Sequence, residues 1–204
     1  CELIIRKFGM SGSQSYKTDI ILTLYKDLRT VFRLVDVAML SGVTDIPGLS
    51  KKLNYYVRKK QLENPRKGIY VKPDYNREEL ACCLYSPCYI SLGYVLQKKG
   101  IIFQYDSQIT VISYLSRVKE IDNQSYRYRK LKGELLVNNT GVMQLPNYVN
   151  MAVAERAFLD MLYLSPEFYF DNLNSLDKSL INKLLPIYQS GALTKRTEKL
   201  LCHV

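Results

Sequence analysis

The side chains with the clearest chemical potential in this chain are the Lys and Arg residues between Lys51 and Lys72. The stretch reads KKLNYYVRKKQLENPRKGIYVK and holds eight basic residues against one acid, Glu63. It therefore carries +7 of the formal net charge of +10. Charge concentrated in so short a segment is typical of a surface that binds a polyanion. The alternative is a solvated face, which is what most surface Lys and Arg residues form.

A helical wheel divides the first part of this stretch into an apolar and a basic face. Start signals at Asp45, Pro47 and Ser50 predict a helix that ends near Lys60. With residues about 100° apart on the wheel, one side holds Leu49, Leu53, Tyr56 and Val57. The opposite side and its flanks hold Lys51, Lys52, Asn54, Tyr55, Arg58 and Lys59. Lys and Arg can contact phosphate or guanine, Asn can contact adenine, and Tyr can hydrogen-bond or stack, so we expect this face to bind DNA.

A hairpin is predicted directly after this helix, over residues 62–71. Turn residues such as Pro65 and Gly68 place Arg66 and Lys67 at its tip. A basic hairpin tip beside a basic helix is well placed to contact the backbone or the minor groove of DNA. An ordinary surface turn is the alternative interpretation.

Two shorter helices are expected before the basic one. Asp19 can cap a helix over residues 20–28, and residues 36–40 form a second helix that Gly42 ends. Residues 30–32 suit a short strand. Two helices joined by a short Gly-containing turn form a helix-turn-helix, and the basic hairpin would be its wing. The first part of the chain is therefore predicted to be a winged helix-turn-helix.

Length and composition limit what the remainder can be. A chain of 204 residues with 47% hydrophobic content fits one large or two small domains. Residues 1–75 contain 14 basic and 7 acidic residues, whereas residues 76–204 contain 15 and 12. The polar segment KPDYNREE lies at this boundary, so we expect domains at 1–75 and 76–204. Residues 1–9 are interpreted as a candidate leader.

The second half of the chain mixes helical and strand patterns, which predicts an α+β domain. Strands are expected at 109–114, 125–131 and 141–149, and helices at 78–84, 91–99, 152–164, 176–185 and 193–201. The helix over 152–164 is apolar on most of its surface and should be buried. No apolar run reaches the roughly 18 residues that a membrane span needs. The five cysteines are odd in number and include no C-x-x-C pair, which argues against a disulfide framework and a zinc site. With no signal-peptide pattern, we expect a cytoplasmic protein.

No convergent set of catalytic residues or metal ligands is visible. Glu155 and Asp160 lie about 140° apart around their helix, so we expect capping or an ion pair with Arg156 rather than catalysis. His203 is the penultimate residue and is discounted as a ligand or base. The P-loop, Rossmann, G-x-S-x-G and H-E-x-x-H patterns are all missing from the sequence. We therefore expect no enzyme activity, no metal and no cofactor; an enzyme acting on nucleic acid is the weakest of the hypotheses.

A second basic group lies in the segment YRYRKLK. It consists of Arg127, Arg129, Lys130 and Lys132. In a strand, Arg127 and Arg129 project to one face and the tyrosines beside them to the other. The segment is either an amphipathic strand with its basic side in solvent or a second surface for a polyanion or a partner.

Several segments, in this order, resemble the AbiEi-type antitoxins of abortive-infection, type IV toxin–antitoxin pairs. They are VFRLVDVAMLSG (31–42), RKGIYVKP (66–73), SPCYISLGYVLQKKGII (86–102), the strand residues Thr110 to Ile112 and Tyr126 to Tyr128, and VNMAVAERAFLDMLYL (149–164). The resemblance implies a winged-helix DNA-binding domain joined to an antitoxin domain. Such proteins repress their own operon and neutralise a nucleotidyltransferase-like toxin, generally without a stable complex. The alternative is a winged-helix repressor that has no toxin partner and whose second domain serves oligomerisation or ligand sensing.

Overall fold

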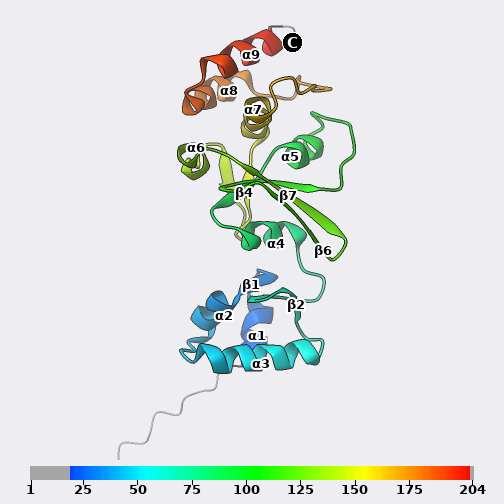
Figure 1. Ribbon diagram of the computed structural model, residues 1–204, viewed down its shortest axis with the longest axis vertical. Helices are drawn as coiled ribbons and strands as arrows, with labels where there is room; N and C mark the ends of the chain where they lie inside the picture. The colour runs from blue at the N-terminus through cyan, green and yellow to red at the C-terminus, as the bar shows by residue number, and fades with distance from the viewer. Residues whose placement is uncertain (1–18, 203–204) are drawn as a thin grey trace, which may run out of the picture.

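The computed structural model describes residues 19–202, in which helices are combined with a three-stranded and a six-stranded sheet. The molecule is elongated, with α1 to α3 at one end, the large sheet in the middle and α7 to α9 at the other end (Figure 1). The fold is therefore α+β. The candidate leader at residues 1–9 and His203 lie outside the described residues. None of the described helices is both long and apolar enough to cross a membrane.

Residues 20–71 form three helices and the small sheet. In chain order the elements are α1 (Ile20–Lys26), β1 (Val31–Arg33), α2 (Leu34–Ser41), α3 (Ile46–Arg58), β2 (Glu63–Arg66) and β3 (Ile69–Val71). The expected caps form, because Asp19 accepts a hydrogen bond from the Ile21 amide at 3.2 Å and Asp45 accepts one from the Gly48 amide at 3.0 Å. Gly42 ends α2 with a φ of 64°. The helices and strands expected here are present, with ends that differ by one or two residues.

The small sheet packs apolar residues on both of its faces. Its order is β1-β3-β2, with both pairs antiparallel. Successive residues of a strand point to opposite faces. Phe32 and Tyr70 accordingly belong to the core beneath α1 to α3, whereas Val31, Ile69 and Val71 belong to the core of the second half. The two halves are thus in apolar contact across this sheet.

The second half surrounds a mixed sheet of order β6-β7-β5-β4-β9-β8. The strands are β4 (Cys88–Ile90), β5 (Ile109–Ser113), β6 (Arg117–Ile121), β7 (Gln124–Lys130), β8 (Val142–Gln144) and β9 (Asn150–Ala152). The helical elements are α4 (Arg77–Leu84), α5 (Gly93–Lys98), α6 (Gly133–Val137), α7 (Ala154–Leu164), α8 (Lys178–Leu184), the 3-10 helix η1 (Leu185–Tyr188) and α9 (Gly191–Leu201). One face of the sheet carries α4, and α5 and α7 lie on the other (Figure 1).

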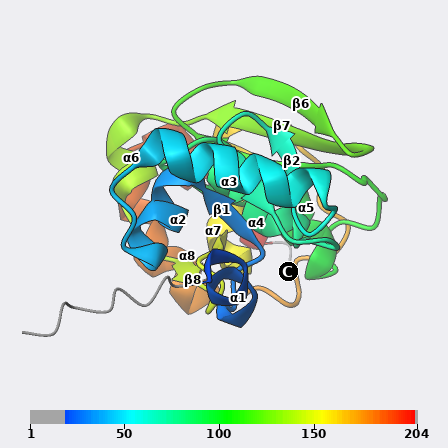
Figure 2. The same cartoon turned by 90° about the horizontal axis from the view of Figure 1, so that it is seen from below.

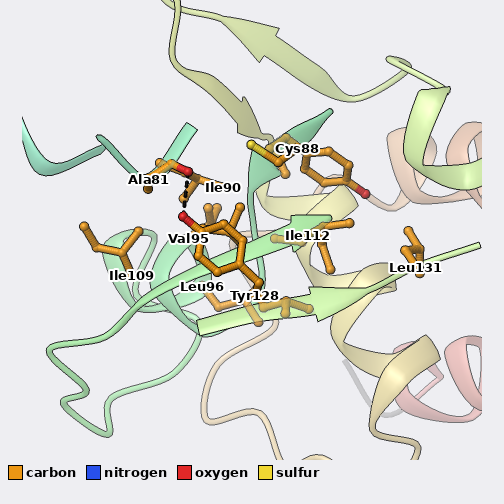
Figure 3. Packing of buried hydrophobic residues seen from close by; sticks show 14 of the residues in the cluster. Ala81, Cys88, Ile90, Val95, Leu96, Ile109, Ile112, Tyr128 and Leu131 are labelled. Carbon is orange, nitrogen blue, oxygen red and sulfur yellow. Dashed lines mark hydrogen bonds between the residues drawn. The ribbon is translucent and has the colours of Figure 1, made fainter. Parts of the chain in front are cut away.

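Tyr128 shows which face of the large sheet turns toward α4. It is 1% exposed, and its hydroxyl donates a hydrogen bond of 2.7 Å to the Ala81 carbonyl of α4 (Figure 3). Tyr126 lies two residues earlier in β7 and therefore projects to the same side. Arg127 and Arg129 project to the opposite side, where α5 and α7 lie.

A buried carboxylate connects the two halves at β1. Glu79 of α4 is 6% exposed, and one of its oxygens accepts hydrogen bonds from the Thr30 amide (2.6 Å), the Thr30 hydroxyl (2.9 Å) and the Val31 amide (3.0 Å). Its other oxygen accepts one from Asn147 at 3.0 Å. Because this carboxylate accepts from the Thr30 and Val31 amides at the start of β1, it links α4 to the first half.

Helix α7 is buried as expected and contains an ion pair. Arg156 and Asp160 are both fully buried, with Arg156 Nε 3.4 Å from a carboxylate oxygen of Asp160. Asp160 also accepts hydrogen bonds from Tyr89 (3.0 Å), Ser91 (2.8 Å) and Tyr188 (2.6 Å). The expected pairing with Arg156 is therefore present, and these contacts occupy the carboxylate.

Candidate nucleic-acid interface

Helix α3 presents its predicted apolar and basic faces in the folded chain. Leu49 and Leu53 are 2% and 0% exposed, and Tyr56 and Val57 are half-buried. The predicted contact residues Lys51, Lys52, Asn54, Tyr55, Arg58 and Lys59 are all exposed. The helix lies across the end of the molecule, as the view from below shows (Figure 2). Its basic face is therefore open to solvent along its length.

The charges on α3 are not neutralised within the described part of the chain. The ion pairs among residues 19–202 are Arg29 with Asp27, Lys98 with Glu78, and Arg156 with Asp160, and none involves α3. A group of unpaired cations on one helical face attracts a polyanion over a distance comparable to the Debye length.

The two polar side chains of this face are partly engaged by the fold. Asn54 accepts a hydrogen bond from the Tyr70 hydroxyl at 3.4 Å, which leaves its amide NH₂ group as a donor. The Tyr55 ring is 47% exposed and lies 5.8 Å from the Lys59 ammonium. Both side chains are therefore held in place beside the basic residues, and Tyr55 retains an exposed hydroxyl.

Of the two residues predicted at the hairpin tip, only Lys67 lies in the turn, because Arg66 is the last residue of β2. Arg66 donates a hydrogen bond of 3.3 Å to the Leu84 carbonyl, and its guanidinium lies 5.2 Å from the centre of the Tyr85 ring. Lys67 is exposed. The turn between them and β3 is held by Asn64, whose amide donates to the carbonyls of Arg66 and Ile69. Arg66 is also exposed, but unlike Lys67 it contacts the second half through these two interactions.

Strand β6 adds two cations to this side of the molecule that the sequence analysis missed. Arg117 lies opposite Tyr128, and Lys119 lies opposite Tyr126, in the antiparallel pair with β7. Residues directly opposite each other project to the same face of a sheet. Arg117 and Lys119 therefore project to the α4 side, which is the side that also carries the first half (Figure 1).

Tyr85 connects the hairpin to β6. Arg117 donates a hydrogen bond of 3.5 Å to its hydroxyl, and Arg66 stacks on its ring. Burial would raise the pKa of Tyr85, but the hydrogen bond from Arg117 and the charges of Arg66 and Lys119 outweigh burial and lower that pKa. Tyr85 thus contacts one arginine from each half of the chain, Arg66 and Arg117.

A turn signal in the sequence could have located β6. Asp122 and Asn123 have φ values of 50° and 59°, which is the conformation of a two-residue hairpin turn. This Asp-Asn pair follows the segment RVKEI, but the segment lacks the apolar alternation that marks a half-buried strand, because its side chains are mostly exposed.

The second basic group is divided between surfaces. Arg127 is exposed and Arg129 half-buried on the face away from α4, as predicted, while Tyr126 and Tyr128 are buried. Lys130, one residue further along the strand, projects to the other face. Lys132 lies beyond the strand at the start of α6. Only Arg127 and Arg129 therefore share a surface, and they line a pocket of about 350 Å³.

A scan against models of known protein families finds no match to this chain, and no curated protein matches it either. The resemblance to AbiEi-type antitoxins therefore rests on the sequence motifs alone. Within residues 19–202, no cluster of three or more His, Cys, Asp or Glu side chains is arranged to hold a metal ion.

Proposed function

We propose that this chain is a cytoplasmic, non-enzymatic DNA-binding regulator whose residues 20–71 act as a winged helix-turn-helix. The main observation in support is that α3 buries Leu49 and Leu53 and exposes a basic face whose charges form no ion pairs within the described residues. The element order helix, strand, helix, helix and hairpin, with sheet order β1-β3-β2, supports it. In this proposal α3 enters the major groove as the recognition helix, and the β2–β3 hairpin is the wing.

The proposed footprint extends from α3 onto β6. Phosphate contacts position a protein on DNA, while contacts to base edges provide sequence specificity. We assign base contacts to Lys51, Tyr55 and Arg58, and phosphate contacts to Lys67 and to the β6 residues Arg117 and Lys119. The hydrogen bond from Arg117 to Tyr85, beside the wing residue Arg66, supports this extension.

The antitoxin role is proposed on the resemblance to AbiEi-type proteins. In this view the chain represses its own operon and neutralises a nucleotidyltransferase-like toxin, with no stable complex required. The surface proposed for neutralisation is the one that carries Arg127 and Arg129, because it faces away from α4 and leaves α3 available to DNA. The second candidate function is a repressor without a toxin, and the arginine-lined pocket favours a ligand-sensing second half in that case.

A gel-shift titration on the DNA upstream of its own gene tests the DNA-binding proposal. The triple variant Lys51→Ala, Tyr55→Ala, Arg58→Ala should lose operator-specific binding, whereas Arg127→Gln with Arg129→Gln should bind as wild type does. Unchanged affinity in the folded triple variant would show that α3 is not the recognition helix. Co-expression with the neighbouring gene, scored by growth rescue, separates the antitoxin from the plain repressor.

A further inference from the structure

A pocket lies on the face of the large sheet opposite α4. Its volume is about 350 Å³, within the range of small-molecule sites. The floor is formed by Arg127 and Arg129 of β7 with Thr110 of β5, which pairs with Arg127 in the parallel register. Apolar side chains of α7 and of the segment that follows it, including Met161 and Phe168, form a wall.

The two arginines bring positive charge into this pocket. The ion pairs found among residues 19–202 lie elsewhere, so neither guanidinium is neutralised by a carboxylate of the described chain. Asp106 also lines the pocket and lowers its net positive charge, but it forms no ion pair with either arginine. Because residues two apart on a strand are separated by about 7 Å, one phosphate group between the arginines could receive hydrogen bonds from both.

The backbone beside the pocket is strained. Leu92, which lines the pocket, has φ 61° and ψ −142°, a conformation that side-chain-bearing residues rarely adopt. Strain of this kind persists where the surrounding structure fixes it, and it clusters at ligand sites. The next residue, Gly93, leaves open space, because a Cβ atom there would approach Ile102 and Met161 only to 3.9 Å.

We propose that this pocket binds a nucleoside monophosphate. The phosphate would lie between Arg127 and Arg129, and the base would pack against the aromatic rings of Phe168 and Tyr105, both of which line the pocket. A dianionic phosphate matches two guanidinium groups better than a monocarboxylate does, because it can neutralise both charges. The site lies away from α3 and does not depend on DNA binding.

Isothermal titration calorimetry of the full chain tests this proposal. The titrants are AMP, GMP, CMP and UMP, with the matching nucleoside and inorganic phosphate as comparators. We expect at least one monophosphate to bind saturably and at least tenfold more tightly than its nucleoside or inorganic phosphate. Failure of all four monophosphates to bind, or equal binding of the nucleoside or of inorganic phosphate, would overturn the proposal.

Matched variants locate the site. Arg127→Gln with Arg129→Gln should abolish binding, while Lys130→Gln with Lys132→Gln, which removes the same charge outside the pocket, should bind as wild type does. Gly93→Leu should weaken binding at least tenfold by filling the pocket, and it tests the site even if the arginine variant unfolds in a thermal melt. The α3 triple variant should retain binding. Equal losses in the two charge variants, or binding lost in the α3 variant, would place the ligand elsewhere.

Discussion

At the scale of single residues, Arg58 and Arg66 carry the same charge but have different surroundings. Both side chains are exposed, but Arg66 also donates to the Leu84 carbonyl and stacks on Tyr85. Arg58→Ala should therefore weaken operator binding by about 1–3 kcal/mol if Arg58 contacts a guanine, and Arg66→Ala should weaken it less. Gel-shift titrations at one salt concentration measure both. A larger loss for Arg66→Ala would mean that the wing, and not α3, makes the specific contact.

The buried pair in α7 gives a stability prediction at the same scale. Asp160→Ala would leave the Arg156 guanidinium buried without its countercharge and would remove the acceptor for three hydroxyl groups. We expect a loss of about 3–5 kcal/mol in the free energy of unfolding, measured by urea denaturation. Glu134→Gln, on the exposed start of α6, is the control and should change stability little. A loss below about 1 kcal/mol for Asp160→Ala would show that the pair does not behave as a buried one.

At the scale of elements, the Glu79 carboxylate connects α4 to the start of β1, alongside the hydrogen bonds from Arg33 to the Cys83 carbonyl. Glu79→Ala would leave the Thr30 and Val31 amides without their acceptor. A buried unsatisfied group costs about 1–3 kcal/mol, so the variant should unfold at a lower urea concentration than wild type. Glu120→Ala, on the exposed strand β6, is the matched control. Equal midpoints for the two variants would show that Glu79 does not stabilise the junction.

The elements around α3 could be predicted from the sequence because local signals determine them. Caps at Asp19 and Asp45, the turn at Gly42 and the apolar spacing of α3 act over a few residues. Elements that depend on contacts between distant segments were not predicted from the sequence. The segment 141–149, expected to be one strand, is part of the β8–β9 hairpin, and β4, β6 and α6 were not predicted. β4 is only three residues long, and all three are buried, so it shows no alternation.

The candidate site likewise has features that local sequence patterns predict and features that they do not. The exposure of α3 side chains follows from helical periodicity, and the faces of Arg127 and Tyr128 follow from strand periodicity. The contact of Arg66 with Leu84 and the grouping of Arg117 near Tyr85 do not. They depend on tertiary packing between segments far apart in the chain, which no local pattern encodes.

At the scale of the whole molecule, the proposed DNA-binding face of α3 and the surface that carries Arg127 lie on different sides of the large sheet. Arg127→Glu with Arg129→Glu should impair growth rescue from the toxin and leave operator binding nearly unchanged. The α3 triple variant should derepress the operon and still rescue growth. A plate assay measures growth rescue, and a promoter reporter measures derepression of the operon. Thermal melts confirm that the variants fold. A folded double Glu variant that rescues as well as wild type would exclude this surface from neutralisation.

The most direct test of the central claim, that α3 reads DNA while β6 holds its backbone, is operator affinity measured against salt concentration. Arg117→Gln with Lys119→Gln should still prefer the operator to scrambled DNA. Its slope of log K against log salt should be shallower than that of wild type by about 1.8, which corresponds to two phosphates. The α3 triple variant should lose the preference for the operator. A β6 variant with the wild-type slope, or an α3 variant that still prefers the operator to scrambled DNA, would contradict the account.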